Sequence, residues 1–449
     1  MAPGVSQTAQ TPGSSRHAGP DRAAGPAPLW AIGALTFIGS LGTGLVTNGI
    51  GFLAQSALGY ADRGNYGLHL ALGLAYILGA LGVSPALRAM SRRSRRVTTR
   101  SVLIGVLVAI AAVCQLPLVS ALDGGPPTAW SLWAMVVVFA PLTGALWPIV
   151  ESYLSGGRQG RELRHAVGGF NIVWASAVAV SFWISAPLLA ASPLTLIALL
   201  GVAHALAIPI VIFMGAEPGR HLADEPHRVD PVDRRLLTVF RVLLPTSYIV
   251  ASSLLPFLPE TLARLGVAAA WTMPIASTWM IVRVGVFTLM QRWHGWRHAP
   301  WAPIVGAGLL LVGFAIAVGT RTLDAGGVGP IALLIGGLAS FGAGMAVIYA
   351  AALYYAMEVG AAEVDAGGVH EALIGVGYTT GPLLGLLALT VGGLPDADQT
   401  PIVAFETLLI GMVSVVAVGA TLVAFGLAWR RPFELNDESD DKPDEPNDR

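Results

Sequence analysis

The 449-residue chain has little charge and almost no cysteine. Only 12% of its residues are charged, about half the fraction usual in soluble domains, whereas 54% are hydrophobic. A soluble protein of this length could not bury so much apolar surface, so the composition excludes that class. The single cysteine, Cys114, excludes an intrachain disulfide framework. A net charge of −1 leaves no basic surface typical of nucleic-acid binding, and we expect no such partner.

Motifs of metal and cofactor chemistry are missing as well. The sequence has no HExxH helix, no phosphate-binding P-loop, no paired cysteines and no G-x-S-x-G elbow. The clustered His, Asp and Glu residues that a membrane-embedded enzyme would need are also absent from any one region. We therefore expect no cofactor, no metal and no enzymatic activity, and a primary pump is disfavoured.

Long hydrophobic runs dominate the chain instead. A bilayer core of about 30 Å is crossed by about 20 apolar residues in a helix. Twelve runs meet this length: 29–56, 66–90, 101–122, 129–154, 165–191, 194–215, 236–259, 269–291, 301–319, 329–357, 368–392 and 401–428. We expect an all-α integral membrane protein with twelve transmembrane helices. The first run is too long for a signal peptide and should remain as a span.

The arginine residues divide unequally between the loops. With the N-terminus inside, the interior loops hold 17 arginines, and the exterior loops hold only Arg63, Arg264 and Arg321. The positive-inside rule then predicts a multi-pass protein of the cytoplasmic (inner) membrane with both termini in the cytoplasm. Residues 1–28, rich in Ala, Pro, Gly and Ser, and the acidic residues 431–449 are predicted to be disordered cytoplasmic tails.

The spans fall into two groups of six. The longest polar connection, 216–235, separates them, and at an offset of roughly 200 residues the basic interior loops at Arg92 and Arg292 come into register. We expect an N-terminal bundle over 29–215, a cytoplasmic linker over 216–235 and a C-terminal bundle over 236–430. A parallel repeat of this kind is typical of transporters that bind their substrate between the halves near the membrane midplane.

Over residues 29–430 this plan resembles the major facilitator superfamily. The loop after the second run, "LRAMSRRSRR", is a degenerate form of that family's G-x-x-x-D-R-x-G-R-R motif. Arg92, Arg95 and Arg96 match, but Ser91 stands in place of the Asp. The resemblance implies two six-helix bundles with a cavity lined by spans one, four, seven and ten. The missing Asp puts the family's charged latch between the halves in doubt.

A second motif lies in the stretch "GGVHEALIGVGYTTGPLLG". Its spacing, G-x8-G-x3-G-P-x2-G, is that of the family's antiporter motif, but it falls on the eleventh span and not on the fifth. The motif therefore supports the fold and says little about the direction of transport. Its matching residues are Gly368, Gly377, Gly381, Pro382 and Gly385.

The spacing of these glycines also has a direct physical meaning. Gly377, Gly381 and Gly385 are four residues apart, which predicts one flat stripe for close packing against a neighbouring helix. The resemblance places spans two, five, eight and eleven between the halves. There a glycine seam would serve either rocking of the halves or static packing.

Three spans carry charges that need a partner. Arg283 lies in the middle of the eighth run, where a charge costs about 2.5–3.5 kcal/mol on insertion scales, so we expect it to meet a wet cavity, a carboxylate or an anionic ligand. A structural salt bridge is the alternative. Glu151 is either a proton-coupling carboxylate or the partner of Arg158 or Arg161. His370 and Glu371 open the eleventh run, where the acid would suit the helix dipole, and a proton relay is the alternative.

Polar and aromatic residues suggest the substrate site. In the first run Ser40, Thr43 and Thr47 share one face, with Asn48 beside them. They are candidates for substrate hydrogen bonds, although Ser and Thr also bond helix to helix. The remaining candidates for a polar–aromatic pocket are Trp147, Asn171, Trp174 and Tyr349.

These features favour a monomeric secondary transporter that moves a small organic molecule across the lipid bilayer by alternating access. Proton coupling through Glu151 is compatible with this function, and an aromatic cavity leans toward export. A non-transporting membrane sensor or assembly protein on the same scaffold is the alternative, which the degenerate loop motif favours and the charge at Arg283 opposes.

Overall fold

The computed structural model describes residues 26–430 except 95, 123–127, 159, 220–230, 324–327, 360–363 and 393–402. The described residues form helices joined by short connections, and no strand occurs among them. Twelve helical segments are long and apolar enough to cross a membrane, which confirms the predicted number of spans.

The first six spans begin with α1 (Leu29–Gly42), which continues into the π-helix η1 (Thr43–Asn48) and is followed by α2 (Ile50–Leu58). The others are α3 (Asp62–Arg93), α4 (Thr99–Val113) with α5 (Leu116–Val119), α6 (Ala129–Ser155), α7 (Gly160–Ala191), and α8 (Pro193–Ala207) with η2 (Ile208–Phe213).

The seventh span joins α9 (Pro231–Leu254), η3 (Leu255–Phe257) and α10 (Leu258–Arg264). It is interrupted where Pro256 and Pro259 remove backbone donors. The last five spans are α11 (Ala269–Ala276) with α12 (Thr278–Arg292), α13 (Ala302–Gly319) with η4 (Thr320–Thr322), α14 (Val328–Val359), α15 (Val364–Val391) and α16 (Val403–Arg430).

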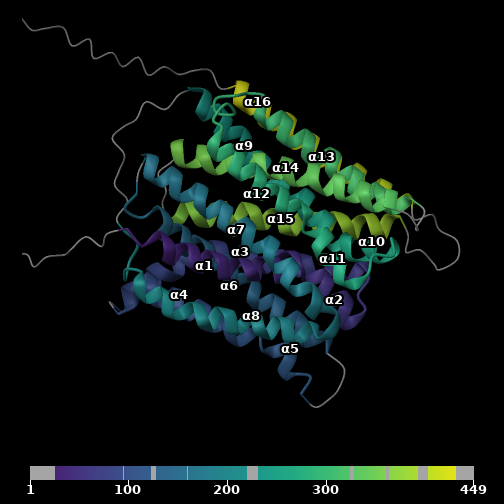
Figure 1. The fold of residues 1–449 in the computed structure, drawn as a ribbon. Helices are drawn as coiled ribbons and strands as arrows, with labels where there is room; N and C mark the ends of the chain where they lie inside the picture. The colour runs from purple at the N-terminus through teal and green to yellow at the C-terminus, as the bar shows by residue number, and fades with distance from the viewer. Residues whose placement is uncertain are drawn as a thin grey trace, which may run out of the picture.

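The helices lie side by side, with the first six spans below and the last six above in Figure 1. Helices α3, α7, α12 and α15 run between the two groups, where α3 packs on α15 and α7 on α12. The start of α1 and the end of α16 lie at the same end of the bundle, at the left of Figure 1. We call this the terminal end and the opposite one the far end.

The glycines of the α15 motif pack against two neighbouring helices, α9 and α3. A Cβ atom at Gly381 would lie 2.5 Å from the carbonyl oxygen of Ile249 on α9, and Ser252 donates a 2.6 Å hydrogen bond to the carbonyl of Gly377. Gly385 instead faces the ring of Tyr66 on α3, and Gly368 faces the carbonyl of Ala80 on α3. The expected single stripe is therefore divided. Gly377 and Gly381 bind α15 to α9 among the last six spans, as static packing would, and Gly368 and Gly385 face the other group. Pro382 lies inside α15, which continues past it.

Replacing Gly377 by Ala tests how tight this seam is. The new Cβ would lie 2.8 Å from the carbonyl carbon of Tyr248, so the backbones of α9 and α15 must separate. Overpacking of this kind costs about 1–3 kcal/mol, and we expect a lower midpoint of thermal unfolding in detergent. Gly411→Ala on α16 is the control, because no atom lies within 4 Å of its added Cβ, and its midpoint should stay or rise. Equal midpoints for the two variants would contradict close packing at Gly377.

A buried ion cluster joins the two groups of spans at the far end. The guanidinium of Arg321, in η4, donates to Asp62 at the start of α3 at 2.7 Å and lies 3.4 Å from Glu406 of α16. All three side chains are at least 90% buried, and the ring of Phe257 lies 4.7 Å from the guanidinium carbon. We call these three residues the far-end latch. Asp62 belongs to the first six spans and the other two to the last six.

Three further hydrogen bonds join the two groups at the same end. Tyr66 donates to the carbonyl of Ser253 at 2.7 Å, Trp183 donates to Ser277 at 3.0 Å, and Gln55 donates to Glu260 at 3.3 Å. Each of these bonds joins the first six spans to the last six. Together with the latch they connect the two groups of spans at the far end.

The described arginines of the loop motif, Arg92 and Arg96, make no comparable latch at the terminal end. Arg92 is exposed in the last turn of α3 and Arg96 is exposed just after it, and Arg95 lies outside the described residues. Neither Arg92 nor Arg96 forms an ion pair with any described residue. The loss of the Asp at position 91 put the latch of the loop motif in doubt, and these two arginines form no such ion pair.

Candidate functional site

A small cavity lies in the centre of the bundle. Its volume is about 20 Å³, which is room for about one water molecule. Spans from both groups contribute to its wall. The lining residues are Thr43, Thr47, Tyr76, Trp147, Glu151, Phe170, Trp174, Tyr248, Tyr349, Glu371, Ile374 and Tyr378.

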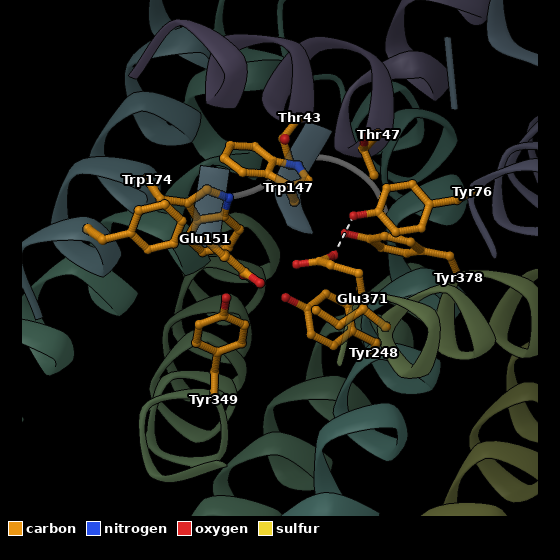
Figure 2. Close-up of a pocket in the computed structure, with 12 residues that line it drawn as sticks. Thr43, Thr47, Tyr76, Trp147, Glu151, Trp174, Tyr248, Tyr349, Glu371 and Tyr378 are labelled. Atoms are coloured by element: carbon orange, nitrogen blue, oxygen red, sulfur yellow. Dashed lines mark hydrogen bonds between the residues drawn. The ribbon is translucent and has the colours of Figure 1, made fainter. Parts of the chain in front are cut away.

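Two carboxyl groups meet in this cavity. Glu151 of α6 and Glu371 of α15 lie within hydrogen-bonding reach of each other, and Tyr76 donates a 2.5 Å hydrogen bond to Glu371. Figure 2 shows the two side chains entering the same space from opposite sides. An ionised carboxylate can only accept a hydrogen bond, so a bond between two carboxyl groups requires a proton on one of them. The pair is thus a site that can hold and release a proton between the two groups of spans.

Two structural roles were considered for these residues: an ion pair of Glu151 with an arginine, and a first-turn position of Glu371 beside the helix dipole. The structure shows neither arrangement. Arg158 does not pair with Glu151, because its guanidinium donates to the carbonyls of Tyr153 and Leu154 and lies 3.7 Å from Glu162. Helix α15 begins at Val364, seven residues before Glu371, so the carboxyl group is too deep in the helix to interact with the first-turn dipole.

Three tyrosines around the pair were not predicted. Tyr76, Tyr248 and Tyr378 come from α3, α9 and α15, and their rings meet edge to face at centroid distances of 5.3 and 5.5 Å around Tyr378. Tyr248 and Tyr378 are each the only tyrosine of a long apolar run, and Tyr76 shares its run with Tyr66. A buried tyrosine hydroxyl normally requires a hydrogen-bond partner. A tyrosine hydroxyl in an apolar span, which needs a hydrogen-bond partner, was therefore the sequence feature that could have identified these residues. Tyr378 even lies within the glycine motif.

Arg283 of α12 is held in an aromatic cage. Its guanidinium carbon lies 4.5 Å from the ring centroid of Trp174, 4.6 Å from Tyr349 and 5.2 Å from Phe287. The rings of Trp174 and Tyr349 are stacked, 5.7 Å apart with 3° between their planes, so α7 meets α14 here. The side chain of Arg283 is fully buried.

The cage supplies no counter-charge. The Tyr248 hydroxyl approaches the guanidinium, but all three guanidinium nitrogen atoms lack a well-directed hydrogen bond. No carboxylate of the described residues forms an ion pair with Arg283. The structural salt bridge considered for Arg283 is therefore not formed, although cation–π contacts offset part of the cost of burying the charge.

A second, larger cavity opens near the terminal end. Its volume is about 500 Å³, and it lies between α7, α12, α14 and the segment that follows α12. We call it the vestibule. Phe287, which touches Arg283, is part of its wall. Its lining holds no Asp or Glu of the described residues, and its basic lining residues are Arg161, Arg164, His165, His294 and Arg297.

The remaining predicted site residues lie in four locations. Thr43 and Thr47, both in η1, line the central cavity with Trp147, Trp174 and Tyr349. Ser40 and Asn48 are buried in the same span but do not line that cavity. Asn171 lines the vestibule. His370 meets Tyr349 edge to face, with ring centroids 6.0 Å apart, and its Nε2 atom has no hydrogen-bond partner.

Comparisons with known proteins identify the fold. No family model and no curated protein sequence match this chain. Two solved structures of the nucleoside transporter NupG, one of them a single-residue mutant, resemble it with TM-scores of 0.58 and 0.59 at 12% identity. Both alignments cover 90% of this chain and 99–100% of the other. The twelve spans thus have the major facilitator fold, as expected, and identity this low shows the fold alone.

Proposed function

We propose that this protein is a secondary transporter of the major facilitator type, which exports a small organic solute in exchange for protons. The observation that carries the proposal is the Glu151–Glu371 pair, two carboxyl groups that face each other in the central cavity and belong to opposite groups of spans. The transport activity named for the NupG structures supports the same class of function.

The orientation follows from the arginine distribution. We place the terminal end in the cytoplasm, because the arginine-rich connections precede α4 and α7 and follow α12 at that end. The vestibule then opens toward the cytoplasm, and the far-end latch faces the outside. A solute enters from the cytoplasmic side in this state, which is why export is the proposed direction.

The carboxyl pair can couple protons to movement of the halves. While one proton is shared, Glu151 and Glu371 attract each other and hold α6 against α15. After that proton leaves, two negative charges face each other in a low-dielectric cavity, where repulsion is far stronger than in water. The repulsion favours separation of α6 from α15, so protonation selects between two arrangements of the halves.

Purified protein in liposomes tests the function. The vesicles are loaded with a pooled library of metabolites and drug-like compounds, a pH gradient is imposed, and mass spectrometry compares their contents with protein-free vesicles. We expect at least one compound to move only when the gradient is present. Movement that ignores the gradient would contradict proton coupling. A folded protein that moves no compound would favour the alternative, a membrane sensor or assembly protein.

A further inference from the structure

The proposed proton mechanism assigns no role to the charge of Arg283. The side chain is fully buried, its three guanidinium nitrogen atoms have no well-directed hydrogen bond, and no described carboxylate pairs with it. Burial of a charge without a partner is strongly unfavourable. Glu151 and Glu371 are close enough to share the neighbours Tyr248 and Tyr349 with Arg283, yet they lie within hydrogen-bonding reach of each other and neither forms an ion pair with Arg283. The guanidinium is therefore available for an anion that comes from outside the protein.

The vestibule provides the route for such an anion. Five of its lining residues are arginine or histidine, and no Asp or Glu lines it within the described part of the chain. Arg161 is exposed, and Arg297 lies over the ring of Tyr354 at 4.9 Å. A cleft lined by one sign of charge between low-dielectric walls concentrates ligands of the opposite sign. Phe287 lines this cleft and also contacts the guanidinium of Arg283.

We propose that the transported solute is a small organic anion, which enters through the basic vestibule and pairs with Arg283. The planar guanidinium binds a carboxylate through two parallel hydrogen bonds, and the flat apolar body of the solute packs against the rings that now surround the cation. This inference rests on the proposed transport function and names its substrate class.

Binding must also separate the two halves. The central cavity, with room for about one water, is too small for an organic solute. A solute that reaches Arg283 has to part the stacked rings of Trp174 on α7 and Tyr349 on α14, which belong to opposite groups of spans. Anion binding at Arg283 therefore opens the contact between α7 and α14 and links substrate occupancy to the movement of the halves.

Matched probes that differ only in charge test the proposal. Benzene, naphthalene and indole skeletons are each used as the carboxylate, the carboxamide and the aminomethyl derivative, and binding to purified protein is followed by tryptophan fluorescence and calorimetry. We expect at least one carboxylate to bind about tenfold or more tightly than its amide and amine partners. Arg283→Met should remove that preference, because it weakens binding of the carboxylate far more than binding of the amide. Arg283→Lys should keep part of the preference.

Two vestibule arginines serve as a second, independent arm. Arg161→Gln combined with Arg297→Gln should slow association of the carboxylate and weaken its dependence on salt, with little effect on dissociation. Arg92→Gln, which removes an exposed arginine that does not line the vestibule, is the control and should change neither rate.

Arg283→Met should unfold at a midpoint no lower than the parent protein, since it removes a charge without a counter-charge. A lower midpoint would mean that Arg283 is structural and would overturn the proposal.

The binding and transport measurements test the two proposals separately, so either proposal can be contradicted while the other holds. If no carboxylate binds better than its amide, or if Arg283→Met binds the carboxylates as well as the parent, the anion site is wrong, even where the liposomes show proton-driven transport. If the carboxylate preference depends on Arg283 but no compound crosses the membrane, the anion site holds and the transport function is wrong.

Discussion

Glu371→Gln is expected to abolish the proton-driven concentration of the solute while the protein remains folded. One pH unit corresponds to about 1.4 kcal/mol, so exchange of one proton per solute sustains about a tenfold concentration ratio when the membrane potential is clamped at zero. Glutamine keeps the shape of the side chain and accepts the hydrogen bond from Tyr76, but it cannot release a proton. In proteoliposomes with a one-unit gradient, the variant should reach a ratio of one.

Companion variants separate coupling from general damage. Glu151→Gln should give the same loss, because the proton is held between the two carboxyl groups and both are needed. Glu162→Gln is the matched control: its exposed carboxylate pairs with Arg158 near the terminal end, and such pairs contribute at most about 1 kcal/mol. It should keep the tenfold ratio. Retention of that ratio by Glu371→Gln would remove the pair from the mechanism.

Arg321→Met is expected to open the far end. The substitution leaves the buried carboxylates Asp62 and Glu406 without their cation, and breaking a buried ion pair in this way costs about 3–5 kcal/mol. That cost falls only on the state in which the far end is closed, so the population with an open far end rises by about a hundredfold or more. Gradient-driven transport should fall as well, because the closed state is now rare.

Cysteine labelling measures this opening. Cys114, which is buried, is replaced by Ala, and His69→Cys supplies a reporter that lies two turns along α3 from Asp62 and is buried beneath the latch. In intact cells a membrane-impermeant maleimide should label the reporter slowly in the parent and about tenfold faster or more with Arg321→Met. Arg264→Gln is the control, because its pair with Glu260 is partly exposed, and it should label at the parental rate. Equal rates for all three proteins would contradict the latch.

The spans could be predicted from the sequence, but most partners could not. Hydropathy alone identifies twelve apolar helices, because each span satisfies its backbone hydrogen bonds within itself. Arg283 stood out as a charge in the middle of an apolar run, yet its aromatic partners on α7 and α14 are separated from it by 109 and 66 residues of sequence. The pairing of Glu151 with Glu371 is equally non-local, and Glu371 looked like a first-turn acid because the start of α15 lies further upstream than its hydrophobic run.

The far-end latch was missed for a different reason. Asp62, Arg321 and Glu406 each lie at the end of a span, where an isolated charge reads as a solvated residue. Only the packing of α3, η4 and α16 shows that all three are buried. The glycine motif has the same limitation: its spacing predicts close helix packing, but the neighbour that each glycine faces depends on the rotation of α15 within the bundle.

The π-helix η1 determines where the first span could lose one residue without a change in helical register. A π-turn carries one residue more than an α-turn would, and here it spans Thr43–Asn48, whose threonines line the central cavity. Deleting a residue elsewhere in a helix turns everything beyond it by about 100° and misplaces an entire face. Deleting one within η1 would instead restore regular helix and leave the flanks in register, at the expense of the cavity wall. A sequence alignment of this span with an unbroken helix therefore needs a single gap at η1. Deletion of one residue there, as well as side-chain substitution, would change the wall of the central cavity.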